Sequence, residues 1–357
     1  MGVPGWISIE KKLNMMGELG YFGVVTRTLL DFIISQKIDE RVGFVWSFEP
    51  KNLGVSTHFV SHSLAMIIHE YPKGFHHLSF VIFFRVNNQE KSLHKELFEP
   101  QRWRQWIDPQ LLEILARWHQ AEDPQVNMVD LESFTALKAL APGIFTFPCF
   151  TSEFCQMILE EVRHYQKSDL PERPPNSMNN YGLVLNEIGM MPLFTQMLSQ
   201  VMSPLAARLF GNEEDRVASL KGQPTIGNWG GSQLDTHHTF VVQYAVENDK
   251  NLDMHIDECD ITFNIGLTEN PDFEGNQLAF CGMYDADDHR RHLLTYSHVR
   301  GQCVVHCGKQ RHGALDIEHG ERASLIMWTK SHAFRRTPEY KKLYDLTRSQ
   351  VVKRHAF

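Results

Sequence analysis

Residues 254–267 read Met-His-Ile-Asp-Glu-Cys-Asp-Ile-Thr-Phe-Asn-Ile-Gly-Leu, and this stretch decides the fold class. Its second half, residues 260–267, is short, apolar and β-branched, as is typical of a buried strand. His255 and Asp257 are two positions apart, so in an extended chain their side chains point to the same face and can reach one metal ion. The stretch therefore predicts β-structure that presents a metal-binding pair.

Strand-like runs dominate the chain from residue 222 to residue 328, with glycine and polar turns between them. Several short strands of this kind favour a β-sandwich or barrel. The other expected strands are 238–245, 277–280, 302–306 and 323–328. A helix is expected at 153–166, with Thr151 or Ser152 as its N-cap, and another at 111–118.

The pattern divides the chain into three parts. Residues 1–140 form an N-terminal α/β region of unknown role, with a helix expected at 20–35 and a buried strand at 78–86. Residues 143–335 carry the chemistry. Residues 336–357 are a basic, amphipathic tail that we expect to be helical.

Composition argues against several classes of protein. The chain has 357 residues, 42% of them hydrophobic and 22% charged, which is a normal globular balance with a net charge of −8. No basic footprint points to nucleic acid as a partner, and no window of about 20 apolar residues could span a membrane. The six cysteines form no CxxC pair, so we expect reduced thiols. With no export signal at its start, the chain is expected to be intracellular, either cytoplasmic or nuclear.

A third metal ligand is expected downstream of His255 and Asp257. Two histidines and one carboxylate on one face of an octahedron make the facial triad of non-haem iron oxygenases. His312 is favoured because it precedes a glycine and stands one strand-turn-strand unit before Arg322. The competing histidines are His292, His298, His306 and His319. The competing carboxylates are Glu258, which faces the other way, and Asp260, which begins the next strand.

Arg322 lies ten residues after His312 and is the expected anchor for a keto-acid co-substrate. A 2-oxoglutarate molecule that chelates iron at one end needs a cation for its far carboxylate, and the planar guanidinium meets a carboxylate in two parallel hydrogen bonds. An ordinary salt bridge at a strand end is the alternative. Tyr244 and Asn264 are further candidates for co-substrate contact. For these two, a half-buried core tyrosine and an asparagine bonded to a neighbouring backbone are equally open.

Longer strings of sequence resemble a known family. Residues 255–267 and 273–280 are similar to the lysyl/prolyl hydroxylase type of 2-oxoglutarate oxygenase. Residues 168–182, 234–244 and 320–322 resemble, more specifically, the family of 2-oxoglutarate and iron-dependent oxygenase domain-containing protein 2. The resemblance covers about residues 145–328. One departure is Asn276, where such oxygenases usually have a second glycine after Gly275, and asparagine tolerates such a turn.

The resemblance implies an α+β fold, with a double-stranded β-helix, or jelly roll, flanked by helices. It implies Fe(II) ligands at His255, Asp257 and His312, a 2-oxoglutarate anchor at Arg322, and support of the reaction by L-ascorbate. The implied reaction is hydroxylation of a C–H bond, in a protein side chain or a small molecule, with release of succinate and carbon dioxide. The loop at 174–181 is a candidate for the substrate mouth, with a purely structural role as the alternative.

Two rival functions are compatible with parts of this pattern. A catalytically inactive jelly-roll scaffold would keep the fold, but it would be free to lose the ligand and anchor residues. A zinc hydrolase could use the same three ligands. However, it gives no role to Arg322 and has no obvious general base.

Overall fold

The structure is a computed structural model that describes residues 62–63, 85–86, 91–120, 134–168, 170, 172–210, 233–284, 286–338 and 340–341. The chain separates into two compact units, and nearly all described residues belong to the unit formed by 56–62 and 84–357. The expected helix at 20–35 and most of the strand at 78–86 lie outside the described residues, as does the tail beyond 341. Two short strands, β1 (His62–Ser63) and β2 (Arg85–Val86), precede the main described part.

The larger of the two main sheets consists of antiparallel strands in the order β3-β4-β12-β8-β14-β6-β5, with β9 pairing separately with β14. Its strands are β3 (Lys138–Ala141), β4 (Ile144–Pro148), β5 (Gly182–Val184), β6 (Thr236–Ala245), β8 (Ile261–Gly266), β9 (Phe273–Gly275), β12 (Gln302–Cys307) and β14 (Ile317–Lys330). Because β14 pairs with β8, β6 and β9, its residues hold the centre of this sheet together.

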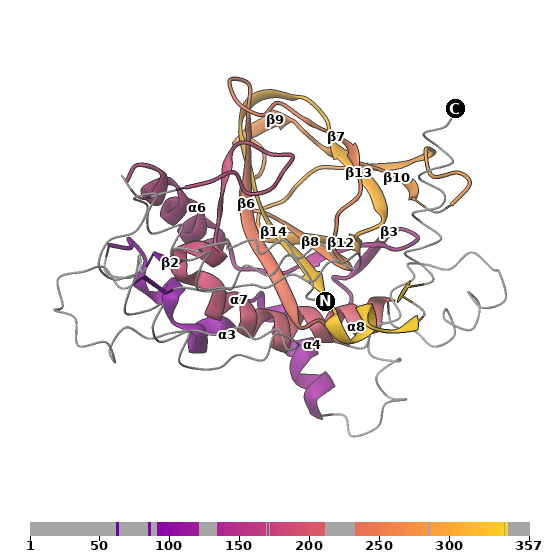
Figure 1. Cartoon of the computed structure of the whole chain (residues 1–357), viewed down its shortest axis with the longest axis horizontal. Coiled ribbons are helices and arrows are strands. Elements are labelled where there is room, and N and C mark those ends of the chain that lie inside the picture. The colour runs from indigo at the N-terminus through magenta and orange to yellow at the C-terminus, as the bar shows by residue number, and fades with distance from the viewer. Residues whose placement is uncertain are drawn as a thin grey trace, which may run out of the picture. The chain divides into compact units, whose positions relative to one another are not determined.

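The smaller sheet is also antiparallel and has the order β11-β10-β13-β7. Its strands are β7 (Leu252–His255), β10 (Leu278–Met283), β11 (His292–Tyr296) and β13 (Gln310–Ala314). The chain alternates between the sheets, since β7 is followed by β8 and β12 by β13 (Figure 1).

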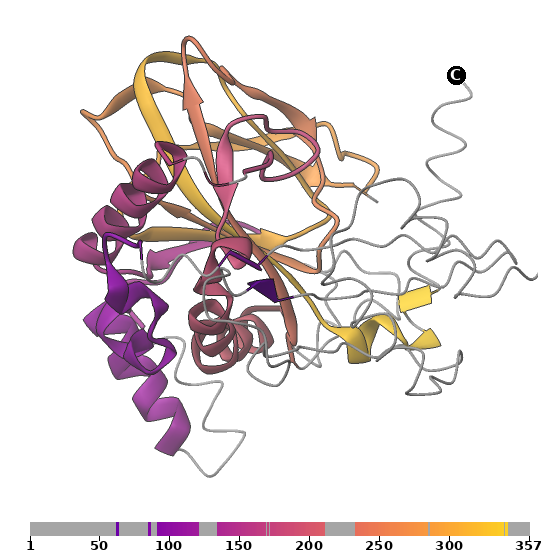
Figure 2. The same ribbon diagram turned by 60° about the vertical axis from the view of Figure 1, so that its left-hand side comes forward.

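Helices gather along one face of the larger sheet (Figure 2). They are α3 (Trp103–Trp106), α4 (Pro109–Gln120), α6 (Ser152–Gln166), α7 (Met191–Met197), α8 (Ser203–Phe210) and α10 (His332–Arg335), with the short turns η3 (Lys95–Phe98), η4 (Pro100–Arg102), η5 (Asn186–Met190) and η6 (Leu198–Met202). Helix α6 begins as expected, because the Thr151 side chain accepts a hydrogen bond from the backbone N–H of Phe154 at 3.2 Å.

Two hydrophobic cores follow from the alternation of side chains along the strands. On β14, Leu325 and Met327 belong to the core shared with the helices, whereas Ile326 belongs to a second core with residues of both sheets. On β6, Val241 faces the helices and Phe240 faces the second core. The larger sheet is therefore buried on both faces, which explains the nearly continuous apolar runs of its central strands.

The expected strands and the helices at 111–118 and 153–166 are confirmed, and β14 is longer than expected. The strands β3, β5, β7, β9, β11 and β13 and the helical segment 186–210 were not anticipated. The helix-side core also includes Leu97 and Leu111, which precede residue 143. All six cysteines are free. Among the described residues, no helix is both long enough and apolar enough to cross a membrane.

Candidate functional site

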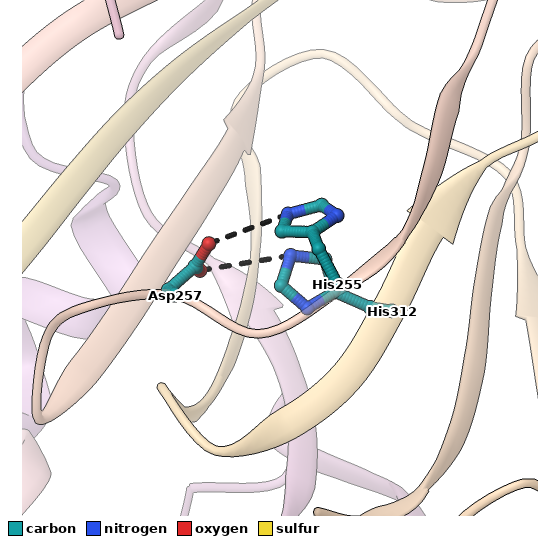
Figure 3. A group of neighbouring side chains, drawn as sticks. All are labelled: His255, Asp257 and His312. Atoms are coloured by element: carbon teal, nitrogen blue, oxygen red, sulfur yellow. Dashed lines mark ion pairs between the residues drawn. The ribbon is translucent and has the colours of Figure 1, made fainter. Parts of the chain in front are cut away.

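The structure brings His255, Asp257 and His312 together at one end of the smaller sheet (Figure 3). His255 ends β7 and lies directly opposite His312 of β13. Gly313 makes this register possible, because a Cβ there would lie 2.6 Å from the carbonyl oxygen of Leu252. Asp257 Oδ1 is 3.4 Å from His255 Nε2, and Asp257 Oδ2 is 3.6 Å from His312 Nε2. One potential ligand atom of each residue lies within 4.8 Å of the others, so the three can share one metal ion.

Backbone hydrogen bonds fix the tautomers of both imidazoles. Nδ1 of His255 donates to the carbonyl of Asp253 at 2.7 Å, and Nδ1 of His312 donates to the carbonyl of Gln310 at 2.9 Å. Because a carbonyl can only accept, the proton of each neutral ring sits on Nδ1. Each Nε2 therefore carries a lone pair that can bind a metal ion placed between the three residues. Hydrogen bonds of this kind commonly fix the tautomer and orientation of metal-ligating histidines.

The carboxylate of Asp257 is buried and held in its ionised form. Thr262 Oγ1 donates to Asp257 Oδ2 at 2.5 Å, and the Asp257 backbone N–H donates to the Gly308 carbonyl at 2.9 Å. Burial alone would raise the pKa of Asp257, but His312 and the hydrogen bond from His255 together bring it below its usual range. The group is thus an anionic ligand at any physiological pH.

The two histidines differ in their affinity for a proton. Burial lowers the pKa of His312 to about 3, against the attraction of Asp257. For His255, burial also acts to lower the pKa, but the hydrogen bond and charge of Asp257 override it and raise the pKa. Without a metal, a single proton at this site therefore resides on His255.

A pocket that is partly open to solvent extends from the three residues between the two sheets. Its walls are mainly apolar and aromatic, and its polar lining includes the metal-binding group, Thr262, Asn264, Tyr244 and Arg322. Asn176, Met178 and Asn179, from the loop expected at the substrate mouth, also line it. Such a concave, mostly apolar pocket with a few convergent polar groups is typical of a ligand site.

Arg322 is a cation buried within this pocket, with only 1% of its surface exposed. Its Nη1 donates to the carbonyl of Asn276 at 2.9 Å and to His298 Nδ1 at 3.1 Å. Its Cζ lies 4.6 Å from the centroid of the Tyr244 ring. Among the described residues, Arg322 has no carboxylate partner and its Nε has no hydrogen-bond partner. Burial lowers the pKa of Arg322 to about 10, so the side chain stays charged at neutral pH.

Asn276 occupies the turn where a second glycine was expected, and it serves the arginine. Its φ of +51° makes it the one non-glycine residue with a left-handed backbone among those described. Asparagine is one of the few residues that tolerate this region, and here its side chain is held by a long-range hydrogen bond from Nδ2 to the carbonyl of Lys250 at 3.1 Å. The turn directs the Asn276 carbonyl at Arg322.

Tyr244 lies opposite Arg322 in the β6–β14 pairing and is buried. Asn179 Nδ2 donates to its hydroxyl oxygen at 3.0 Å. The phenol therefore keeps its own proton free to donate into the pocket that it lines. Asn264, on the same face of β8 as Thr262, is joined to His298 through its Oδ1 at 3.1 Å.

The chain is similar in sequence to several known proteins. The OGFOD2-like domain family matches residues 86–215. The human 2-oxoglutarate and iron-dependent oxygenase domain-containing protein 2 is 37% identical over 224 residues, which cover 62% of this chain and 59% of the human protein. The Arabidopsis thaliana 2-oxoglutarate and iron-dependent oxygenase domain-containing protein ICU11 is 30% identical over 270 residues, or 72% of this chain and 60% of that protein. Residues 86–215 thus match the OGFOD2-like domain, and the chain is similar in sequence to these two proteins. It spans about 60% of the length of these two relatives.

A prolyl hydroxylase of Trichoplax adhaerens, solved with a peptide of the hypoxia inducible factor oxygen degradation domain, aligns with 63% of this chain and 94% of its own. The sequence identity is 14% and the TM-score 0.40. A likeness of this size carries no weight for the function of this chain.

The competing residues from the sequence occupy other places. The His306 ring lies 4.5 Å from that of His312, but its Nδ1 bonds the Cys307 carbonyl and it is not part of the group of three. His298 contacts Arg322 instead. His292 and His319 are exposed, as is Glu258. Asp260 is structural, since it binds Arg335 at 2.9 Å.

Sequence reasoning missed the roles of four residues at this site, namely Thr262, Asn179, Asn276 as an acceptor, and His298. Thr262 carried a usable signal, because a hydroxyl two positions before Asn264 on a buried strand must face the same side. Asn179 lies in the loop at 174–181 that was expected at the substrate mouth, and His298 was considered only as a metal ligand. The contacts that both residues make depend on tertiary packing.

Proposed function

We propose that this chain is an Fe(II)- and 2-oxoglutarate-dependent dioxygenase. His255, Asp257 and His312 are the proposed iron ligands, and Arg322 is the proposed anchor for the far carboxylate of 2-oxoglutarate. Tyr244 and Asn264 are proposed to contact the co-substrate. The family's relatives carry both cofactors in their names, which supports the proposal.

The donor set suits ferrous iron. Two imidazole nitrogens and one carboxylate oxygen leave three adjacent positions of an octahedron free, enough for a bidentate keto acid and dioxygen. A structural zinc site would instead be closed by four protein ligands. With iron bound, the centre supplies the oxidative chemistry that converts a C–H bond to C–OH while 2-oxoglutarate becomes succinate and carbon dioxide.

The observation that carries the proposal is the buried guanidinium of Arg322. A charge removed from water is expensive unless an opposite charge accompanies it. Within the described part of the chain no carboxylate meets Arg322, whereas the pocket beside it ends at a metal-binding group. A dicarboxylate that binds metal at one end and arginine at the other satisfies both requirements.

The protein's own residues supply position and shielding. Backbone carbonyls hold both imidazoles in the metal-binding tautomer, and Thr262 orients the carboxylate of Asp257. Apolar walls limit the access of water to the reacting atoms. The two facing antiparallel sheets support assignment of the fold as a double-stranded β-helix.

The primary substrate is proposed to be a protein side chain or a small molecule with an accessible C–H bond. It would enter past Asn176 and Met178, because these residues are partly exposed and line the pocket. The pocket's aromatic wall, which includes Trp328 and Phe240, suits an aliphatic group. No cluster of cations among the residues lining the pocket favours nucleic acid.

Anaerobic titration tests the proposal. Apo-protein receives Fe(II) and then 2-oxoglutarate, with ascorbate to keep the iron reduced, and the visible charge-transfer band of the chelate is followed. We expect the band in the wild type, its loss in His255→Ala, and a much higher 2-oxoglutarate requirement in Arg322→Met. His292→Ala is the matched control, because it removes an exposed histidine outside the site. Iron binding without a band would contradict the proposal and favour a catalytically inactive scaffold.

A further inference from the structure

His298 is a buried histidine outside the metal-binding group, and only 4% of its surface is exposed. Its ring joins two pocket residues. Arg322 Nη1 lies 3.1 Å from His298 Nδ1, and Asn264 Oδ1 lies 3.1 Å from His298 Nε2. The three side chains thus form a continuous chain of hydrogen bonds along one wall of the pocket.

The hydrogen bonds among these three side chains can run in only one direction, from Arg322 through His298 to Asn264. A guanidinium can only donate, so His298 Nδ1 must accept and carry no proton. The proton of the neutral ring then sits on Nε2 and is donated to Asn264. An acceptor is required there, so the amide of Asn264 must present its oxygen to His298 and its NH₂ group elsewhere. This orientation follows from the donor inventory and does not depend on how the amide atoms were assigned.

The environment keeps His298 neutral. Burial and the positive charge of Arg322 both lower its pKa well below that of a free imidazole. The other ring packed against it is Tyr296, at 5.7 Å between centroids. No carboxylate among the described residues is recorded in contact with the His298 ring, so nothing stabilises its protonated form.

The NH₂ group of Asn264 is directed at the ligand space. Asn264 lines the pocket, and its Nδ2 has no hydrogen-bond partner among the described residues. Thr262, two positions earlier on the same face of β8, holds the metal ligand Asp257. Asn264 therefore lies beyond the metal end, on the way to Arg322.

We propose, building on the proposed function, that His298 is a positioning residue that orients Arg322 and Asn264 so that both donate to the far carboxylate of 2-oxoglutarate. Its Nδ1 fixes one Nη of the arginine, leaving Nε and the remaining N–H groups for the ligand. Its Nε2–H fixes the amide oxygen of Asn264, leaving the amide N–H groups for the same carboxylate.

The backbone around His298 is clamped onto β8, as precise positioning requires. Gly266 pairs with Arg300, and the backbone N–H of Gly301 donates to the carbonyl of Gly266 at 2.9 Å. A Cβ at Gly266 would lie 2.6 Å from the carbonyl oxygen of Val299 and 3.4 Å from Cβ of His298. Alanine at 266 would therefore push the loop that carries His298 away from the pocket.

Keto-acid selectivity separates positioning from a merely structural role. Affinities of the Fe(II) protein for 2-oxoglutarate and for pyruvate, which lacks the far carboxylate, are measured anaerobically in wild type, His298→Phe and His298→Gln. His298→Phe keeps a planar ring but removes both nitrogens. We expect it to weaken 2-oxoglutarate binding by about 10–100-fold, the usual cost of removing a residue that orients a ligand-binding group by hydrogen bonding. Pyruvate binding is expected to stay at its wild-type level. His298→Gln, which retains an acceptor and a donor, is expected to recover part of the 2-oxoglutarate affinity.

Two loop variants sharpen the result. Gly266→Ala is expected to reproduce the selective loss of 2-oxoglutarate affinity, because it displaces His298 without touching the ligand. Val299→Ala, which trims an exposed side chain of the same loop, is the matched control and is expected to bind both keto acids normally. Equal losses of 2-oxoglutarate and pyruvate, or no loss in His298→Phe, would overturn the proposal.

A spectroscopic readout is independent of turnover and of keto-acid binding. Imidazole ¹⁵N shifts of the metal-free wild type report the tautomer of each ring, and His298 is assigned among the 19 histidines by comparison with His298→Gln. A protonated Nε2 with a bare Nδ1 supports the proposal, and a protonated Nδ1 overturns it. If the wild type binds no keto acid at all, the proposed function fails together with the role of His298 in ligand binding. If the wild type binds 2-oxoglutarate and His298→Phe binds it equally well, only the role of His298 is refuted.

Discussion

Replacing Arg322 by methionine tests whether this buried cation binds the far carboxylate of 2-oxoglutarate. In the ligand-free protein two effects oppose each other. An uncompensated buried charge costs several kcal/mol, and its removal relieves that cost. The substitution also leaves the Asn276 carbonyl and His298 Nδ1 without their donor, at about 1–3 kcal/mol each. We therefore expect the ligand-free Tm to stay within about 5 °C of wild type, since 1 kcal/mol shifts Tm by about 2–4 °C in a domain of this size.

The response to 2-oxoglutarate should change far more. Two hydrogen bonds from a guanidinium to a carboxylate contribute about 1.5–3 kcal/mol each, so their loss weakens binding by about 100-fold or more. At about 100 times the wild-type Kd, 2-oxoglutarate stabilises the wild type by about 2.7 kcal/mol, which raises Tm by about 5–10 °C. In Arg322→Met the same concentration would give about 0.4 kcal/mol, a shift of about 1 °C.

Anaerobic thermal unfolding of the Fe(II)-loaded protein, with and without 2-oxoglutarate, measures both quantities. Arg335→Met is the matched control, because Arg335 is paired with Asp260 at 2.9 Å and lies outside the pocket. That variant should lower the ligand-free Tm and keep the full 2-oxoglutarate shift. A normal shift in Arg322→Met would refute the anchor. A ligand-free Tm lower than that of Arg335→Met would refute the argument that the charge of Arg322 is uncompensated.

Three further predictions concern the metal end of the pocket. Asp257→Ala should weaken Fe(II) binding by more than the about 10–100-fold typical of outer-shell changes, while Glu258→Ala, its exposed neighbour, should leave calorimetric Fe(II) affinity unchanged. Because the pKa of His255 is raised and that of His312 is lowered to about 3, one proton competes with the metal. Fe(II) affinity should therefore fall by about tenfold per pH unit below the pKa of His255 and be level above it, and a slope of two protons would contradict this. Tyr244→Phe should weaken 2-oxoglutarate binding by about tenfold or more if the free phenol proton bonds the ligand; unchanged affinity would assign Tyr244 to the core.

Strand alternation made much of the fold readable from the sequence. The runs at 238–245, 260–267 and 323–328 contain residues for both faces of the larger sheet, and all three strands were found. The strands of the smaller sheet were harder to find. β7 and β11 are partly exposed, and their residues alternate too weakly to reveal a period of two. The helical segment at 186–210 contains Gly189 with φ +105° and Pro192, which interrupt the helical pattern.

The metal-binding group could be predicted from the sequence because the spacing and neighbours of its ligands carry the signal. His255 and Asp257 are close in sequence, and the glycine after His312 has a physical reason, the close approach of β13 to β7. The role of His298 could not be predicted from neighbouring residues, because it depends on a loop that pairs with Gly266 and on an arginine 24 residues away. Contacts of this kind follow from tertiary packing, so they are invisible to spacing arguments.

His306 and His312 both point between the two sheets, but only His312 belongs to the metal-binding group. On β12, Val304 faces the second core, so His306 two residues later points between the sheets as well. It lies on the larger sheet, however, and its ring packs against Phe280 and His312 instead of reaching the carboxylate. Burial lowers its pKa, and its Nε2 has no partner within the described part of the chain. His306 therefore backs the ligand ring as a neutral aromatic surface, and it is His312, on the smaller sheet directly opposite His255, that stands at the distance a shared metal requires.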